Sequence, residues 1–169
     1  MDLPFVLSLV RLAFLISMLF CTFFLKAQEN VVVFAKYDDM SPQFLKNNDT
    51  LYVVNFWATW CKPCVAELPF FLEAEQFYKS EKVKFLLVSL DFSDQLEKRV
   101  VPFIAKNNIK STCFLLADQD ANGWIPKVDA DWSGAIPASV IFKNGKKVHF
   151  TEGNFESTTD LKKLINNHL

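Results

Sequence analysis

The sequence predicts an α/β domain with a central mixed β-sheet that is flanked by helices on both faces. Residues 51–56 and 83–90 are almost continuously apolar, as strands covered on both faces are, and helical periodicity fills residues 61–79 between them. This order predicts a right-handed βαβ unit with parallel strands. Residues 138–150 contain two short apolar runs around an Asn-Gly pair, which indicates an antiparallel hairpin. A sheet with both kinds of strand pair is mixed.

Length and composition favour one folded domain and argue against nucleic-acid binding. The chain has 169 residues, of which 51% are hydrophobic, and 18 are phenylalanines, so it has enough apolar material for a sizeable core. A formal net charge of −1, with no basic cluster in the sequence, leaves no electrostatic footprint for nucleic acid. The four cysteines are too few for a disulfide-stapled scaffold, and only two of them are close in sequence.

Residues 1–27 are typical of a signal peptide. They contain an uncharged apolar run at 12–25 and a small residue, Ala27, after which we expect cleavage. Retention as an N-terminal membrane anchor is the alternative, because residues 3–25 are long enough to span a bilayer. Both routes predict an extracytoplasmic (periplasmic) protein, secreted or membrane-anchored, with a folded domain at 28–169.

The other elements follow from local patterns along the folded domain. A short β-branched run predicts a first strand, and a helix follows that is broken or started near Ser41-Pro42. After residue 95, helical spacing interrupted by Pro102 predicts one kinked helix or two short ones. A capping box that begins at Ser157 predicts the final helix. In chain order, these segments are a strand at 31–34, a helix within 37–46, a loop at 91–94, helical structure at 96–104, a strand at 113–117, an irregular loop at 118–133 with a short helix near 124–128, and the C-terminal helix.

Cys61 and Cys64 lie where the strand at 51–56 gives way to a helix. Unpaired N–H groups and the positive end of the helix dipole stabilise an anion at this place, and hence the thiolate of Cys61. Cys64 lies one turn later, within disulfide reach, and Pro63 is tolerated because the first turn needs no intrahelical donor. The pair predicts a dithiol/disulfide switch in which Cys61 is the nucleophile and Cys64 resolves the mixed disulfide.

The sequence around this pair resembles the active site of the thioredoxin superfamily and, within it, the TlpA/ResA-like extracytoplasmic thiol–disulfide oxidoreductases. The resemblance rests on Asn-Phe-Trp-Ala-Thr-Trp at 55–60, on Glu67 and Pro69, and on Gly-Ala-Ile-Pro at 134–137, and it covers residues 30–169. It implies a thioredoxin-like fold. It also implies that Glu67 accepts or relays a proton when the second cysteine attacks; the alternative is an ordinary acidic residue in the first turns of a helix.

The resemblance also implies which residues contact a substrate. The Gly-Ala-Ile-Pro segment resembles the cis-proline loop of the superfamily, which implies a cis Ile136–Pro137 bond and an Ile136 backbone that pairs with an extended substrate. A trans proline at the start of a strand is the alternative. Trp60 is a candidate apolar contact over the disulfide, whereas Trp57 is more typical of a core residue. Asn55 departs from thioredoxins proper, which carry a buried acid there, and this leaves the glutamate as the leading candidate for proton transfer.

Metal-binding interpretations are weaker than the redox interpretation. His149 and His168 are far from the cysteine pair in sequence, and the aspartates of 118–131 lack the order and glycine spacing of an EF-hand. Cys113 lies in an apolar run and is expected to be a small buried filler. We therefore expect no metal site and no cofactor beyond the dithiol itself.

Together these features predict an extracytoplasmic thiol–disulfide oxidoreductase that acts on protein disulfides or thiols. The resemblance implies a reductase of disulfides in exported proteins, such as apocytochrome c awaiting haem, which takes its electrons from a membrane thiol-electron transporter. We expect a monomer. Two alternatives stay open: a disulfide oxidase or isomerase that uses the same site, and a non-catalytic chaperone that binds copper(I) through the two thiolates.

Overall fold

The computed structural model describes residues 31–169. The predicted signal peptide or anchor at 1–27 lies outside the described residues. Within the described part, no helix combines the length and the apolar character that crossing a membrane requires.

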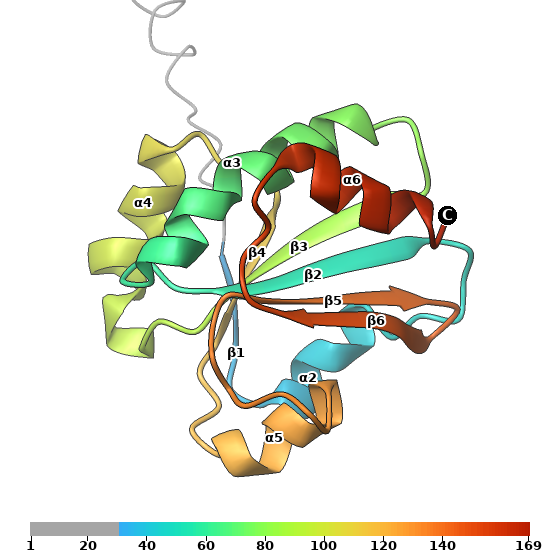
Figure 1. The fold of residues 1–169 in the computed structure, drawn as a ribbon. Helices are drawn as coiled ribbons and strands as arrows, with labels where there is room; N and C mark the ends of the chain where they lie inside the picture. The colour runs from blue at the N-terminus through green and yellow to red at the C-terminus, as the bar shows by residue number, and fades with distance from the viewer. Residues whose placement is uncertain (1–30) are drawn as a thin grey trace, which may run out of the picture.

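The described chain forms a six-stranded sheet with the strand order β1-β4-β3-β2-β5-β6 (Figure 1). The first four of these strands are parallel, β5 runs antiparallel to β2, and β6 runs antiparallel to β5. The predicted mixed sheet is thereby confirmed. All seven residues of β2 are buried, because the strand lies in the middle of the sheet and is covered on both faces. The strands are β1 Val32–Phe34, β2 Leu51–Trp57, β3 Val83–Ser89, β4 Thr112–Leu116, β5 Ala138–Lys143 and β6 Lys146–Glu152.

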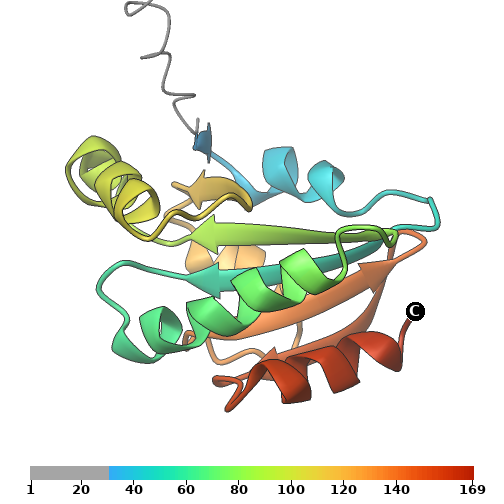
Figure 2. The same cartoon turned by 90° about the horizontal axis from the view of Figure 1, so that it is seen from above.

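Helices cover both faces of this sheet, as predicted. The helix α3 (Lys62–Phe77) and the C-terminal helix α6 (Thr158–Asn166) lie on one face, and α2 (Tyr37–Met40) and α5 (Ala121–Val128) lie on the other (Figures 1 and 2). Alternate residues of β2 point into the two cores, since Val53 packs with α3 and α6 whereas Val54 packs with α2 and α5. The remaining helical segments are η2 Ser41–Gln43, η3 Ser93–Gln95, η4 Leu96–Val100 and α4 Val101–Lys106.

Several element limits differ from the sequence-based prediction. The helix predicted at 61–79 begins one residue later, because Cys61 has an extended backbone and acts as its N-cap. The segment at 91–94 is not entirely loop, since η3 starts at Ser93. The helical structure predicted at 96–104 is a π-helical turn that continues into α4, with Pro102 in the first turn, where its missing N–H is not needed. The break near Ser41 and the cap at Ser157 are as predicted.

Candidate active site

Cys61 and Cys64 form a disulfide at the N-terminus of α3, with 5.3 Å between their Cα atoms. The sulfur of Cys61 lies 3.2 Å from the backbone nitrogen of Cys64 and accepts a hydrogen bond from it. The two sulfurs differ in access, since Cys61 is 6% exposed and Cys64 is fully buried. An external thiol or disulfide therefore reaches Cys61 first, and Cys64 is placed to react only with its neighbour.

The turn between β2 and α3 is held by packing against the buried core and by a backbone hydrogen bond. Trp57 and Ala58 are fully buried, and the ring of Trp57 packs 5.3 Å from that of Phe103. The backbone nitrogen of Cys61 donates to the carbonyl of Ala58 at 3.1 Å, which closes the turn. Trp57 is thus a core residue, as predicted, whereas Trp60 is 57% exposed.

The predicted cis bond between Ile136 and Pro137 is present. The carbonyl oxygen of Ile136 lies 3.7 Å from the sulfur of Cys61, so the structure brings together residues that are 75 positions apart in sequence. Gly134, at the start of this loop, has a φ of +90°, a backbone conformation that residues other than glycine rarely adopt. The loop therefore presents a backbone acceptor directly beside the reactive sulfur.

Trp132 supports the cis-proline loop. The sequence alone predicted only that this residue lies in the irregular segment at 118–133. Its indole N–H donates to the carbonyl of Ala135 at 2.8 Å, and its ring packs 4.9 Å from that of Phe56. On the other side of the loop, the N–H of Gly153 donates to the carbonyl of Pro137 at 2.9 Å. A tryptophan in the mostly polar stretch at 129–134 was the sequence signal for this support, because such a residue needs both burial and a hydrogen-bond partner.

Glu67 is a buried carboxyl group one turn beyond Cys64 and is only 1% exposed. It accepts hydrogen bonds from the side-chain amide of Asn55 at 2.8 Å and from the backbone N–H of Phe155 at 2.9 Å. Burial raises the pKa of Glu67 to about 7, because the loss of solvation outweighs the opposite effect of these two bonds. Asn55 stands where thioredoxins proper carry a buried acid, and here it is a direct hydrogen-bond partner of Glu67. It also donates to the hydroxyl of Ser139 at 3.1 Å.

Asp91 ties the loop after β3 to the active-site turn, a role that its sequence context did not reveal. Its carboxylate accepts hydrogen bonds from the backbone N–H of Thr59 at 2.9 Å, from the hydroxyl of Thr59 at 2.6 Å and from the hydroxyl of Ser89 at 2.8 Å. Asp91 is only 2% exposed. We call this arrangement of Asp91, Thr59 and Ser89 the aspartate clamp.

We expect Asp91→Ala to lower the free energy of unfolding of the oxidised protein by about 2 kcal/mol, because it leaves buried donors without an acceptor. Urea denaturation measures this change. Asp94→Ala is the matched control, since Asp94 is exposed and lies three residues further along the chain, in η3; it is expected to change stability by no more than about 0.5 kcal/mol. Equal effects of the two variants would contradict the role assigned to the clamp.

Cys113 and the aspartates that follow β4 make contacts within the protein. Cys113 is buried in β4, and its thiol donates to the carbonyl of Ser111 at 3.3 Å. Asp118, in the loop after β4, pairs with Lys36 at 3.0 Å, and Asp129, directly after α5, pairs with Lys147. Across residues 31–169, no three His, Cys, Asp or Glu side chains converge in a way that would hold a metal ion.

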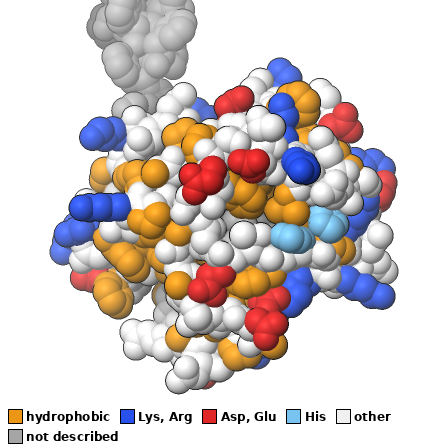
Figure 3. All heavy atoms as spheres, viewed as in Figure 1, with side chains coloured by type: hydrophobic (Ala, Val, Ile, Leu, Met, Phe, Trp, Pro, Cys, Tyr) orange, Lys and Arg blue, Asp and Glu red, His pale blue; other side chains and the backbone are white. Residues whose placement is uncertain are grey.

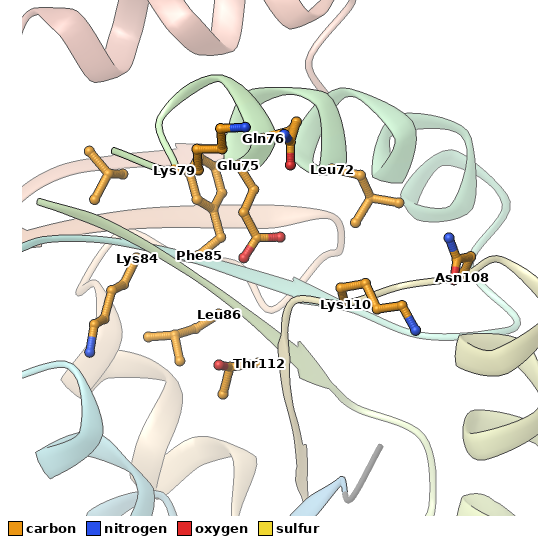
Figure 4. A pocket seen from close by; sticks show the side chains of 11 residues that line it. Leu72, Glu75, Gln76, Lys79, Lys84, Phe85, Leu86, Asn108, Lys110 and Thr112 are labelled. Carbon is orange, nitrogen blue, oxygen red and sulfur yellow. The ribbon is translucent and has the colours of Figure 1, made fainter. Parts of the chain in front are cut away.

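A hollow among the described residues lies apart from the disulfide. A hollow of about 460 Å³ lies between the second half of α3 and strands β3 and β4, where it is lined by Leu72, Glu75, Lys79 and Phe85 among others (Figure 4). None of the cysteines or of the cis-proline loop residues lines this hollow. At the disulfide itself, Cys61 is 6% exposed and Cys64 is fully buried.

A Cys-x-x-Cys disulfide at the start of a helix, opposite a cis-proline on a mixed sheet, defines a protein of the thioredoxin fold with a redox-active cysteine pair. Comparison with known families agrees with this class. The family model "Redoxin" matches residues 26–165, and the chain belongs to the Redoxin family.

Curated relatives carry related names. The chain is 32% identical over 103 residues to the thiol-disulfide oxidoreductase ResA of Bacillus thuringiensis subsp. konkukian (strain 97-27), a match that covers 59% of this chain and 53% of that protein. It is 34% identical over 65 residues to the sporulation thiol-disulfide oxidoreductase A of Bacillus subtilis (strain 168), which covers 38% of this chain and 39% of that protein. The chain thus matches about half or less of the length of these relatives. The resemblance to ResA-like proteins is nevertheless confirmed.

Solved structures share the fold. The crystal structure of StoA from Bacillus subtilis matches with a TM-score of 0.55 at 24% identity, over 70% of this chain and 84% of that chain. The solution structure of an uncharacterized thioredoxin-like protein from Porphyromonas gingivalis matches with a TM-score of 0.55 at 28% identity, over 72% of this chain and 76% of that chain. The predicted thioredoxin-like fold is confirmed.

Proposed function

We propose that the protein catalyses thiol–disulfide exchange with protein substrates through Cys61 and Cys64. The observation that carries this proposal is the disulfide at the start of α3, in which only Cys61 is accessible and the Ile136 carbonyl lies 3.7 Å from its sulfur. A substrate strand that pairs with the Ile136 backbone has its own sulfur beside Cys61. The names of the ResA relatives support the same activity.

In the reducing direction, the Cys61 thiolate attacks one sulfur of a substrate disulfide. The substrate S–S bond breaks, one substrate sulfur leaves as a thiolate, and the other is held by Cys61 in a mixed disulfide. Cys64 then loses its proton and attacks the sulfur of Cys61, which releases the second substrate thiolate. Two electrons have passed from the protein to the substrate, and the Cys61–Cys64 disulfide remains. The same steps in reverse oxidise a substrate dithiol.

Glu67 is proposed to accept the proton that Cys64 loses. Its carboxyl group lies one turn beyond Cys64 on α3, and its pKa of about 7 suits an acid or base that works near neutral pH. The bonds from Asn55 and Phe155 hold the carboxyl group in place while it changes its protonation state.

We further propose that the direction in the cell is reductive and that the substrates are disulfides of exported proteins, such as apocytochrome c awaiting haem. A membrane thiol-electron transporter would return electrons to the Cys61–Cys64 pair. The predicted signal peptide or anchor at 1–27 supports an extracytoplasmic location, and we expect the protein to act as a monomer.

The reduction potential of the Cys61–Cys64 couple tests this proposal. The purified chain is equilibrated against thiol buffers of known potential, and the fraction of dithiol is measured by thiol alkylation. We expect a value near that of thioredoxin, about −270 mV. A value near that of the strong oxidant DsbA, about −120 mV, would instead identify a disulfide-forming enzyme. The absence of a reversible couple would reject exchange chemistry and favour the copper(I) chaperone.

A further inference from the structure

Two aromatic side chains are exposed on loops beside the disulfide. Among the described residues, Phe92 is the most exposed large hydrophobic side chain, at 74%, and Trp60 is exposed at 57%. Figure 3 shows hydrophobic side chains gathered over the side of the molecule where α3 begins, next to the segment from η3 to α4. Trp60 directly precedes Cys61, and Phe92 directly precedes η3.

The aspartate clamp places these two aromatic residues on neighbouring, fixed loops. Asp91 precedes Phe92 and holds both the backbone and the hydroxyl of Thr59, which precedes Trp60. The carbonyl of Phe92 accepts a hydrogen bond from the N–H of Gln95 at 2.9 Å, which fixes the backbone on its other side. The backbone at Phe92 is therefore ordered by its neighbours, while the ring itself remains in solvent.

The sheet order determines on which side of the disulfide Trp60 and Phe92 lie. Strands β3 and β5 lie on opposite sides of β2, so the loop after β3 and the loop before β5 flank the active-site turn from opposite sides. Ile136 lies before β5 and Phe92 lies after β3. A chain that crosses the site from the cis-proline loop therefore passes Cys61 and then meets Trp60 and Phe92.

We infer that Phe92, together with Trp60, forms a docking surface for the substrate polypeptide and selects large apolar side chains next to the substrate cysteine. The inference rests on the proposed exchange function and extends it to substrate choice. Because Cys61 is only 6% exposed and Cys64 is fully buried, a substrate must lay its chain over the surrounding surface in order to bring a sulfur to Cys61. Aromatic side chains that become covered in this way are frequent sources of binding energy and selectivity at interfaces.

Phe77 provides a matched control. It is 60% exposed, but it lies at the other end of α3 from the cysteines and is covered on one face by the ammonium group of Lys162, 3.5 Å from the ring centroid. Phe92→Ala and Phe77→Ala thus remove the same kind of exposed ring from two places, and only the first lies next to the aspartate clamp that binds the active-site turn.

The test uses the reduced full-length chain and measures the second-order rate constant for its oxidation by three disulfides. Two are synthetic peptides, each with one internal disulfide. They differ only in the residues beside the cysteines, which are phenylalanine and leucine in one peptide and serine in the other. The third is 2-hydroxyethyl disulfide, which is too small to cover Phe92. We expect the unchanged protein to prefer the apolar peptide by about tenfold, and we expect Phe92→Ala to lose this preference.

The small disulfide separates an effect on docking from an effect on the cysteines. We expect Phe92→Ala to react with 2-hydroxyethyl disulfide at the same rate as the unchanged protein, and Phe77→Ala to match the unchanged protein with all three disulfides. A Phe92→Ala variant that keeps the peptide preference would overturn the inference, as would one that slows with all three disulfides equally. If the unchanged protein reacts with none of them, the exchange function itself fails.

Discussion

A Cys64→Ser variant is expected to remain attached to its substrate through a mixed disulfide at Cys61, and its turnover is expected to fall by about 10³-fold or more, as when one member of a catalytic unit is removed. Cys61 is the only sulfur of the pair that is accessible, so it still attacks a substrate disulfide. The serine hydroxyl cannot release the substrate by attacking the sulfur of Cys61. Non-reducing electrophoresis and intact mass measurement detect the adduct.

Two variants control this experiment. Cys61→Ser is expected to form no adduct, because the buried Cys64 cannot be reached by a protein substrate. Cys113→Ser is expected to keep its exchange activity, since Cys113 is buried in β4 and its thiol donates to the carbonyl of Ser111. An adduct on Cys61→Ser that is as abundant as on Cys64→Ser would show that the assigned order of attack is wrong.

The second large effect concerns the dependence of stability on pH. Burial raises the pKa of Glu67 from 4.5 to about 7, so between these values the folded protein holds a proton that the unfolded chain has released. The unfolded state then binds fewer protons than the folded state, and the free energy of unfolding falls as pH rises. We expect the titration of Glu67 to lower the free energy of unfolding by about 3 kcal/mol between pH 4.5 and pH 7. This decrease is complete above pH 7.

The comparison of the unchanged protein with Glu67→Gln isolates this contribution. Burial lowers the pKa of His149 and raises that of Glu75, and both groups titrate in the two proteins alike, so their contributions cancel in the difference. We expect the stability difference between the two proteins, measured by urea denaturation of the oxidised form, to change by about 3 kcal/mol over this range. A difference that is constant with pH would contradict the raised pKa of Glu67.

Much of the fold was predictable because its signals are local. The continuous apolar run of β2 and the Asn-Gly turn between β5 and β6 each report a structure that a few neighbouring residues determine. The cysteine pair and the cis Ile136–Pro137 bond were likewise predicted from short motifs. Element limits were less accurate, as at the π-helical turn η4, because the choice among helix types depends on packing as well as on spacing.

The sequence by itself determined that this protein carries a dithiol at the start of a helix in a mixed α/β sheet. Only the tertiary structure decided which distant groups pair with the buried carboxyl groups on the segments around that dithiol. Asp91 reaches Thr59 across 32 positions, and Phe155 reaches Glu67 across 88 positions. Apolar periodicity specifies that a segment is buried, but a buried polar group can bond to any suitable partner that the fold brings within about 3 Å. That choice is made when distant segments come together, and it leaves no mark on the local sequence pattern.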